Sequence, residues 1–338
     1  MNVLITGGAG YIGSHVAVEL YKAGHTPIII DNFDNSRKEV LDSITELTGK
    51  RPRLYEGDVC DETFLDDVFS SEDHIDGVIH FAGLKAVGES IEKPLPYYYN
   101  NITGLLSVLK AMQKYKVPHF VFSSSATVYG DPESNPIPES AQRKEATNPY
   151  GNTKSISEDI IRDTVTSGIP LKAIALRYFN PIGAHPSGLI GELPLGTPAN
   201  LVPYLTQAAA GLRAELSVFG DDYDTPDGTG VRDFIHVVDL AKAHIATLEY
   251  LTTKVKSPFY DIYNVGTGNG VSVKQLIDTF EEVNAVKVPF KIAPRRAGDI
   301  ASCWADPTKI NINMHWRAEK TLKDSLKDAW NWQKGLPK

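Results

Sequence analysis

Two side chains near the middle of the chain have the residue types and the spacing of an acid–base pair. Tyr150 and Lys154 lie four positions apart where a helical pattern begins, so both belong to one helical face. A free tyrosine titrates at about 10, and a nearby ammonium group or a bound nicotinamide cation favours the phenolate. The pair therefore predicts a phenolic base that works near neutral pH. The alternative interpretation is an exposed polar helix face.

Hydroxyl groups end a predicted central strand slightly earlier in the chain. The apolar run Phe120–Phe122 leads into Ser123, Ser124 and Ser125. In an open parallel sheet, ligands bind beyond the carboxyl ends of the strands, so these serines lie where chemistry is expected. The alternative is that they only fill the exit from strand to loop.

A glycine-rich turn near the start of the chain predicts a nucleotide site. The apolar run Val3–Ile5 comes first, the glycines follow, and apolar residues at helical spacing come next. Glycines here let backbone N–H groups approach a phosphate, and the helix N-terminus adds the positive end of its dipole. A side chain at Gly7 or Gly10 would block that approach, and a Cβ at Gly13 would hold the helix off the strand. This order of strand, glycine turn and helix is typical of dinucleotide binding.

An acid at the end of the second predicted strand indicates which dinucleotide binds. Asp31 follows the apolar run Pro27–Ile30, where a carboxylate can accept hydrogen bonds from both adenosine ribose hydroxyls. The same charge repels a 2′-phosphate, which favours NAD over NADP. The alternative is an acid that caps a helix or lies in a loop.

Short apolar runs alternate with helical patterns from Val3 to about Arg177. The runs that we interpret as buried strands are Asn2–Thr6, Thr26–Asp31, Arg53–Glu56, Gly77–Phe81, His119–Ser123 and Lys172–Arg177. Buried strands with helices between them predict an α/β fold, a Rossmann-type doubly wound parallel sheet with right-handed crossovers.

The alternation weakens after Arg177. Asn180–Gly230 is rich in Pro, Gly and Asn, which predicts a smaller, mixed α/β C-terminal lobe that binds substrate. In this part we expect strands over Asp233–Val237 and Asp261–Val265, and a surface helix over Lys320–Gln333.

Two polar residues after predicted strands have two interpretations each. Asp58 could accept a hydrogen bond from the adenine amine, or it could cap the helix that starts at Asp61. Lys85 could reach a phosphate or a ribose, although a lysine is more often simply solvated.

One predicted helix has an apolar stripe that bears on assembly. Its apolar residues recur at helical spacing: Ile102, Leu105, Leu106, Leu109 and Met112. One face must pack on the sheet, and a second apolar face would make a homodimer interface.

Composition narrows the function classes. Net charge is −8 with no basic run, which argues against nucleic-acid and anionic-membrane partners. Cys60 and Cys303 are the two cysteines, so no disulfide framework is implied and a cytoplasmic location is expected. The nine histidines and two cysteines show no metal-ligand spacing, so we expect no metal. No signal peptide and no membrane-spanning run is expected.

Several sequence blocks together resemble one family. They cover nearly the whole chain: Thr6–Ser14, His80–Ser90, Phe122–Asp131, Asn148–Lys154, Arg177–Gly191, Asp227–Asp239 and Arg295–Asp299. The chain is thus similar to the extended short-chain dehydrogenases/reductases, the nucleotide-sugar epimerases and dehydratases. The resemblance implies an isomerase with NAD as cofactor that interconverts UDP-glucose and UDP-galactose at C4 in galactose metabolism.

The resemblance also implies roles for individual residues. The catalytic residues would be Ser125, Tyr150 and Lys154. The NAD contacts would be Gly7, Gly10, Tyr11, Ile12, Gly13, Asp31, Asn32, Asn35, Ser36, Asp58, Val59, Phe81, Ala82, Gly83, Lys85, Asn100, Ser123, Tyr150, Lys154, Tyr178 and Phe179. The UDP-sugar contacts would be Lys85, Ser125, Tyr150, Asn180, Asn200, Leu201, Ser217, Phe219, Arg232, Phe234, Arg296, Asp299 and Cys303.

The residue types agree with these roles, since arginines give bidentate donors to a diphosphate and Phe219 a stacking face for uracil. Without the family, Arg232 could instead pair with Asp233, and Phe219 could belong to the core. The family places parts of the C-terminal region back on the first domain. We therefore expect an NAD-binding domain over 1–179, with returning segments near 232–265, and a UDP-sugar lobe over 180–338.

The reaction implied by the resemblance is a transient oxidation. Tyr150 would remove the 4-hydroxyl proton while C4 gives its hydride to NAD, with Ser125 bonded to that oxygen and Lys154 tuning the tyrosine. The 4-keto sugar would turn and take the hydride back on its other face. Most binding energy must then lie in UDP, and the regenerated cofactor is expected to stay bound.

Three other functions compete with this one. A nucleotide-sugar 4,6-dehydratase needs an acid after a threonine on the serine strand, and here Ser125, Ala126 and Thr127 follow one another with no acid. A non-catalytic NAD-sensing protein could dispense with Tyr150 and Lys154. A dehydrogenase that exchanges NAD with solvent stays open.

One residue bears on substrate range. In several relatives restricted to glucose and galactose, a tyrosine that narrows the sugar pocket stands where this chain has Cys303. The smaller side chain predicts that 2-acetamido sugars are also accepted.

Overall fold

The computed structural model describes residues 1–296 and 298–336, so Ala297, inside the Arg295–Asp299 block, and the last two residues lie outside it. The elements up to the end of the main alternation are β1 Asn2–Thr6, α1 Tyr11–Lys22, β2 Thr26–Asp31, α2 Val40–Thr48, β3 Arg53–Glu56, α3 Glu62–Ser71, β4 Gly77–His80, α4 Val87–Glu92, α5 Pro94–Tyr98, η1 Tyr99–Thr103, α6 Gly104–Tyr115, β5 His119–Ser125, η2 Ala126–Tyr129, α7 Pro149–Thr166 and β6 Lys172–Tyr178. The later elements are β7 Asn180–Ile182, α8 Leu201–Ala209, β8 Leu216–Phe219, β9 Val231–Arg232, β10 Phe234–His236, α9 Val237–Thr253, β11 Phe259–Val265, β12 Val271–Ser272, α10 Val273–Asn284, β13 Phe290–Ala293, β14 Ser302–Cys303, α11 Thr308–Met314 and α12 Leu322–Gly335.

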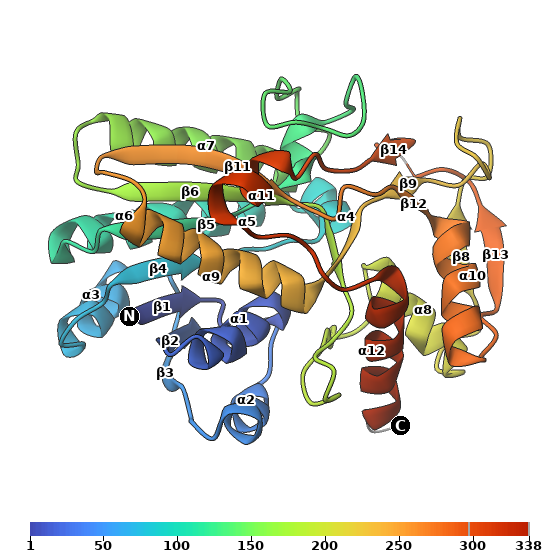
Figure 1. The fold of residues 1–338 in the computed structure, drawn as a ribbon, viewed down its shortest axis with the longest axis horizontal. Helices are drawn as coiled ribbons and strands as arrows, with labels where there is room; N and C mark the ends of the chain where they lie inside the picture. Colours follow the sequence, from blue (N-terminus) through green and yellow to red (C-terminus); the bar gives the residue numbers. More distant parts are fainter. Residues whose placement is uncertain (297, 337–338) are drawn as a thin grey trace.

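The main sheet has seven strands in the order β3-β2-β1-β4-β5-β6-β11. Every neighbouring pair is parallel, which confirms the predicted doubly wound sheet. The order reverses between β1 and β4, so the ligand crevice of this fold is expected beyond the carboxyl ends of these two strands. The sheet occupies one side of the molecule in Figure 1, with α8, α10 and α12 on the other.

Alternating residues of each strand pack on opposite faces of the sheet. Val3 and Ile5 of β1 lie in one core with apolar residues of α1, α2 and α9. Leu4 lies in the other core, with residues of α3, α6 and α7. Because both faces are covered, the strands read as continuous apolar runs, which is why they were visible in the sequence.

The predicted strands are present with small shifts at their ends. β4 ends at His80, one residue early, whereas β5 and β6 continue to Ser125 and Tyr178, because Ser123–Ser125 pair with Leu176–Tyr178. The expected strand Asp261–Val265 starts earlier, at Phe259, and joins the main sheet as β11. The expected strand Asp233–Val237 is shorter and pairs with β7 outside that sheet.

The C-terminal part has a core of its own and three small sheets. Its core gathers apolar residues of β7, α8, β8, β10, α10 and α12. The small sheets are β10-β7, β12-β9-β14 and β13-β8. The surface helix predicted over Lys320–Gln333 is present as α12, and its Leu326 and Ala329 are buried in this core.

The helix with the predicted apolar stripe is α6, which starts after Ile102. Leu105, Val108, Leu109 and Met112 are buried against the sheet, and Leu106 is 41% exposed. Apolar residues with larger exposed fractions precede it on α4, α5 and η1: Val87 43%, Ile91 55%, Leu95 79% and Tyr99 66%.

Candidate active site

The glycine turn lies at the point where the strand order reverses. Gly7 has φ +69, and a Cβ there would lie 2.9 Å from the Ala82 nitrogen of the loop after β4. A Cβ at Gly13 would lie 2.7 Å from the Gly8 Cα. No side chain among the described residues caps α1, so its first amide groups are open to an anion. The turn thus forms a cradle that fits a dinucleotide phosphate.

Asp31 links this cradle to the loop after β2 by hydrogen bonds. Its Oδ2 accepts from the Ala9 nitrogen at 2.9 Å, and its Oδ1 accepts from the Phe33 nitrogen at 2.9 Å and the Ser36 hydroxyl at 2.7 Å. Both oxygens thus have protein partners, as the loop interpretation expects. A carboxylate has about four lone-pair positions, which leaves capacity for a ribose hydroxyl.

The helix-cap interpretation of Asp58 is wrong. α3 is capped by Asp61, whose side chain accepts from the Thr63 and Phe64 nitrogens. Asp58 is exposed, and its side chain accepts from the Cys60 nitrogen at 2.8 Å and from no other described residue, while the neighbouring Val59 is buried. The Asp58 side chain is therefore open to a ligand beyond β3.

The three candidate catalytic residues come from the end of β5 and the first turns of α7. Asn148 caps α7 by accepting from the Gly151 nitrogen at 2.8 Å. Lys154 is buried, and its Nζ donates to the Ser123 carbonyl at 2.7 Å and lies 5.8 Å from the Tyr150 ring centre. Ser125 is the only partly exposed serine of its run, and its Oγ accepts from the Thr127 nitrogen.

The electrostatics of this pair differ from the prediction. Burial raises the pKa of Tyr150 above its usual value, with hydrogen bonding to Ser125 acting in the opposite direction. Burial lowers the pKa of Lys154 to about 8, against the opposing charge of Glu158. The lysine ammonium bonds to a carbonyl instead of the phenol, so the chain alone does not make Tyr150 a base near neutral pH.

Aromatic rings pack together at the carboxyl ends of β4 and β6. His244 of α9 lies between Phe81 and Tyr178, with ring centres 4.8 Å and 5.5 Å away. Burial lowers the pKa of His244 to about 4, so the ring is neutral. The Tyr11 hydroxyl donates to the Gly183 carbonyl at 2.8 Å. His244 was missed because nothing in its helical segment marks it.

Two further polar residues that the sequence did not reveal join parts of the site. Asn101 is buried, and its Nδ2 donates to the Leu84 carbonyl and the Thr153 hydroxyl, both at 3.0 Å. Glu192 accepts from Lys85 at 3.2 Å and from Asn200 at 2.5 Å, so it joins a predicted residue of the loop after β4 to one that precedes α8. These contacts span long sequence separations, which no local pattern records.

The remaining predicted cofactor residues lie on or close to the segments at the carboxyl ends of the strands. Gly83 and Asn100 adjoin Asn101, and Ser123 precedes Ser125 on β5. Asn32 and Asn35 are exposed in the loop after β2. Phe179 is buried, in a small cluster with Ala126 and Cys303.

The predicted UDP residues lie on the short elements of the C-terminal lobe. Ser217 and Phe219 are the half-buried residues of β8 and alternate with the buried Leu216 and Val218. The Arg296 guanidinium lies 3.8 Å from the Phe219 ring centre. Phe219 is therefore at an open face, and the interpretation of Phe219 as core is wrong.

The proposed pairing of Arg232 with Asp233 is also wrong. Asp233 is fully buried and accepts from the backbone nitrogens of Thr267, Gly268 and Ala305. Arg232 instead donates to the Val231 carbonyl at 2.9 Å, next to Cys303 in the register of β9 and β14. The Arg232 guanidinium thus has no acidic partner among the described residues.

Other predicted contacts differ in exposure. Asn180, Asn200, Arg296 and Asp299 are exposed, and Leu201 is half-buried at the start of α8. Phe234 is buried in the C-terminal core, so its side chain is not available to a ligand. Cys303 is 7% exposed and clusters with Ala126, directly after Ser125, which places it near the candidate catalytic serine.

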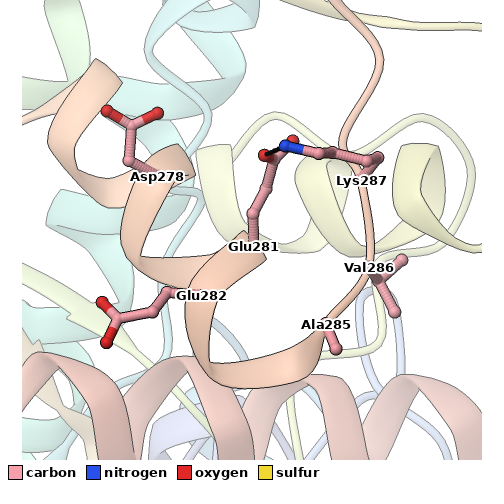
Figure 2. Close-up of a pocket in the computed structure, with 6 residues that line it drawn as sticks. All are labelled: Asp278, Glu281, Glu282, Ala285, Val286 and Lys287. Carbon is pink, nitrogen blue, oxygen red and sulfur yellow. Dashed lines mark hydrogen bonds and ion pairs between the residues drawn. The ribbon is translucent and has the colours of Figure 1, made fainter.

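A surface hollow of about 460 Å³ lies elsewhere, at the carboxyl end of α10. Figure 2 shows the side chains that line it: Asp278, Glu281, Glu282, Ala285, Val286 and Lys287. Lys287 is already ion-paired with Glu281. None of these residues belongs to the predicted site, so we assign the hollow no role in it.

The described residues offer neither a metal-binding cluster nor a membrane-spanning helix. Within 1–296 and 298–336, no three His, Cys, Asp or Glu side chains are grouped to hold a metal ion. No helix in this part of the chain combines the length and apolar character needed to cross a bilayer.

Comparison with known proteins gives a family and close relatives. The model of the NAD dependent epimerase/dehydratase family matches residues 3–266. The UDP-glucose 4-epimerase of Bacillus subtilis is 52% identical over 333 residues, covering 98% of this chain and 97% of the relative. That of Pasteurella multocida is 50% identical over 338 residues, covering 100% and 99%.

Solved structures share the fold over the whole length. The UDP-glucose 4-epimerase of Bifidobacterium longum in complex with NAD+ and UDP is 48% identical, with a TM-score of 0.95 and coverage of 99% and 98%. The enzyme of Stenotrophomonas maltophila with bound NAD and formylated UDP-arabinopyranose gives the same identity, TM-score and coverage.

Proposed function

Because this chain belongs to the NAD dependent epimerase/dehydratase family, we propose that it is a UDP-glucose 4-epimerase that interconverts UDP-galactose and UDP-glucose. One observation carries the proposal. Ser125, Tyr150 and Lys154 converge from β5 and α7 beyond the carboxyl edge of a sheet that holds a glycine cradle at its switch point. A role in galactose metabolism belongs to the same proposal.

The chain's residues fit NAD. The cradle at Gly7, Gly10 and Gly13 leaves room for backbone only, which suits a pyrophosphate. Asp31 has capacity for the adenosine ribose, and Asp58 is open to the adenine amine. When bound, NAD supplies an acceptor that takes a hydride from the sugar C4 and returns it.

The chain's own groups handle the proton and the sugar oxygen. Tyr150 accepts the 4-hydroxyl proton, and the partly exposed Ser125 donates a hydrogen bond from its hydroxyl to that oxygen. The bond from Lys154 to the Ser123 carbonyl holds the ammonium beside the tyrosine, where its charge favours the phenolate. Burial raises the pKa of Tyr150, and a bound nicotinamide cation would lower it, because a positive charge favours the phenolate.

The C-terminal lobe holds UDP. Arg296 covers one face of Phe219, so uracil stacks on the other face. Arg232 lacks an acidic partner in the described part of the chain and is free to bind a diphosphate. Asp299 accepts from the uridine ribose. With binding energy concentrated in UDP, the keto sugar can turn without leaving.

This assignment also proposes an organisation of the chain. The NAD-binding domain covers 1–179 with returning segments near 232–265, and the UDP-sugar lobe covers 180–338.

The exposed apolar residues Val87, Ile91, Leu95 and Tyr99, with Leu106, form the surface that we propose for a homodimer. A monomer mass in solution would rule it out. The free thiols of Cys60 and Cys303 suit a cytoplasmic location.

We further propose that 2-acetamido sugars are accepted, because Cys303 leaves space near Ser125 that a tyrosine would fill. UDP-GalNAc should be epimerised, and Cys303→Tyr should abolish this turnover while sparing UDP-galactose. Absence of UDP-GalNAc turnover at high wild-type concentration would contradict the proposal.

The test of the main proposal uses purified protein without added NAD. UDP-galactose is added, and formation of UDP-glucose is followed. Conversion supports an epimerase that retains its cofactor. Conversion only after addition of NAD would favour an enzyme that exchanges NAD with solvent. No conversion in either case would favour another NAD-dependent epimerase, a 4,6-dehydratase or a non-catalytic NAD sensor. Identifying the products formed from other nucleotide sugars would distinguish these three alternatives.

A further inference from the structure

A buried ion pair lies directly behind the catalytic residues. Glu158 of α7 and Arg177 of β6 are each 2% exposed. Arg177 donates from Nε to Oε1 at 2.8 Å and from Nη2 to Oε2 at 2.6 Å, a bidentate pair. Neither residue belongs to the NAD or UDP-sugar contacts predicted above.

Glu158 and Arg177 contact residues on both sides of Ser125 in the sequence. On one side, the Ser124 hydroxyl donates to Glu158 Oε1 at 2.6 Å. On the other, the Arg177 guanidinium lies 4.7 Å from the ring centre of Tyr129. The Tyr129 hydroxyl in turn donates to Asn264 Oδ1 at 2.7 Å, which fixes the ring. Ser125 therefore lies in a short segment that is held before and after it by the same two charges.

The pair is also coupled to the other two catalytic residues. Glu158 lies one turn after Lys154 and two turns after Tyr150 on α7. Lys154 bonds to the Ser123 carbonyl, and Glu158 bonds to the Ser124 hydroxyl, so α7 and β5 are joined at two successive residues. Any sliding of the helix along the strand would break both bonds.

Stability alone gives a weak reason for such a pair. Burying two charges is costly, and well-packed apolar residues often serve equally well in its place. On this geometry, and on the basis of the function proposed above, we propose that Glu158 and Arg177 are positioning residues that hold Ser125, Tyr150 and Lys154 in register for C4 oxidation.

The charge of Glu158 also affects the protonation of Lys154. The titratable groups that act on or lie near Lys154 are Glu158 and Tyr150 on its own helix and His80 on β4. His80 is neutral, because burial lowers its pKa to about 3. Glu158 opposes the burial that lowers the pKa of Lys154 to about 8. Without Glu158, the ammonium would be lost at lower pH.

The test separates position from stability. Glu158→Gln leaves Arg177 without a counter-charge and is expected to lower thermal stability. The double variant Glu158→Leu with Arg177→Met removes both charges and is expected to restore stability. We predict that its kcat stays reduced by about a hundredfold, as for misplaced catalytic groups, while KM for UDP-galactose changes little. The alkaline limb of its pH profile should move to lower pH.

Ser124→Ala removes only the bond to Glu158 and should lower kcat less than the double variant does. Asp163→Asn is the matched control, because Asp163 lies on the same helix in an exposed ion pair with Arg162. Its kcat, KM and pH profile should equal those of the wild type. Recovery of kcat in a stable double variant would overturn the proposal, as would an unmoved alkaline limb.

A readout without turnover keeps this proposal separate from the proposed function. Amide hydrogen exchange over residues 123–129 of the NAD-loaded protein should become faster in the double variant and stay unchanged in Asp163→Asn. An inactive wild type would refute the epimerase assignment only. Unchanged exchange in the double variant would refute the positioning role, whatever the activity.

Discussion

The two sides of the candidate site are built differently. At the edge formed by β5 and α7, Ser124, Lys154 and Glu158 are buried, and each already has a partner within the protein. In the C-terminal lobe, Asn180, Arg296 and Asp299 are exposed on short loops and strands. The first region has its geometry set before any ligand arrives, whereas the second offers polar groups that a ligand satisfies.

This difference fits the division of labour in a C4 epimerase. The oxidation step needs reacting groups held in one place, because small displacements are costly in rate. The UDP part needs affinity, and open side chains can supply it. Variants on the β5–α7 edge should therefore act on kcat, and variants in the lobe should act on KM. The reverse pattern would contradict the account.

The largest effect is expected at Tyr150. Tyr150→Phe removes the proton acceptor and keeps the ring, so kcat should fall by about a thousandfold, in the range for loss of a general base. Affinity for UDP should be unchanged, as measured by calorimetry. A variant with near wild-type kcat would remove Tyr150 from the chemistry.

A smaller effect is expected in the lobe. Arg296→Ala removes a charged donor and the cover of Phe219, so KM for UDP-galactose should rise by about ten- to a hundredfold with kcat nearly unchanged. Arg295→Ala is the matched control, because Arg295 is already bonded to Asp222 and stacked on Tyr223. Steady-state kinetics on both variants decide the point. Equal losses from the two arginines would contradict a specific role for Arg296.

Acid should weaken the sheet domain. Burial lowers the pKa of His15 and His80 to about 3 and that of His244 to about 4. Unfolded histidine titrates at about 6.5, so between these values the unfolded chain binds more protons than the folded one. The free energy of unfolding should therefore fall as pH is lowered from about 6.5 towards 4. Urea unfolding at several pH values measures this. Replacing His80 with Gln should flatten the slope, and an unchanged slope would contradict burial of its neutral form.

The smallest effect is expected at the hollow on α10. Lys287→Ala breaks an exposed pair with Glu281, and such pairs contribute little. Both kcat and KM should stay at wild-type values. A clear change in KM would show that the hollow in Figure 2 takes part in substrate binding.

The sequence was informative where local physics decides the structure. The buried parallel strands are continuous apolar runs, and the turn at Gly7 to Gly13 needs residues without Cβ atoms, so both were visible as patterns. The position of Tyr150 and Lys154 on one helical face followed from their spacing.

Other features depend on residues far apart in the chain. Strands β9, β12 and β14 have two residues each, too short for any periodicity. Glu158 and Arg177 look like ordinary helix and strand residues until β6 is paired with β5. The raised pKa of Tyr150 in the chain alone was not visible either, because burial and the carbonyl that binds Lys154 are set by tertiary packing.

The most direct test of the central claim follows the hydrogen at C4. UDP-galactose that carries deuterium at C4 is incubated with the protein in ordinary water, with unlabelled NADH added. The account predicts that the product UDP-glucose retains the deuterium at C4, because one bound cofactor takes the hydride and returns it. Product with ordinary hydrogen at C4 would contradict the account.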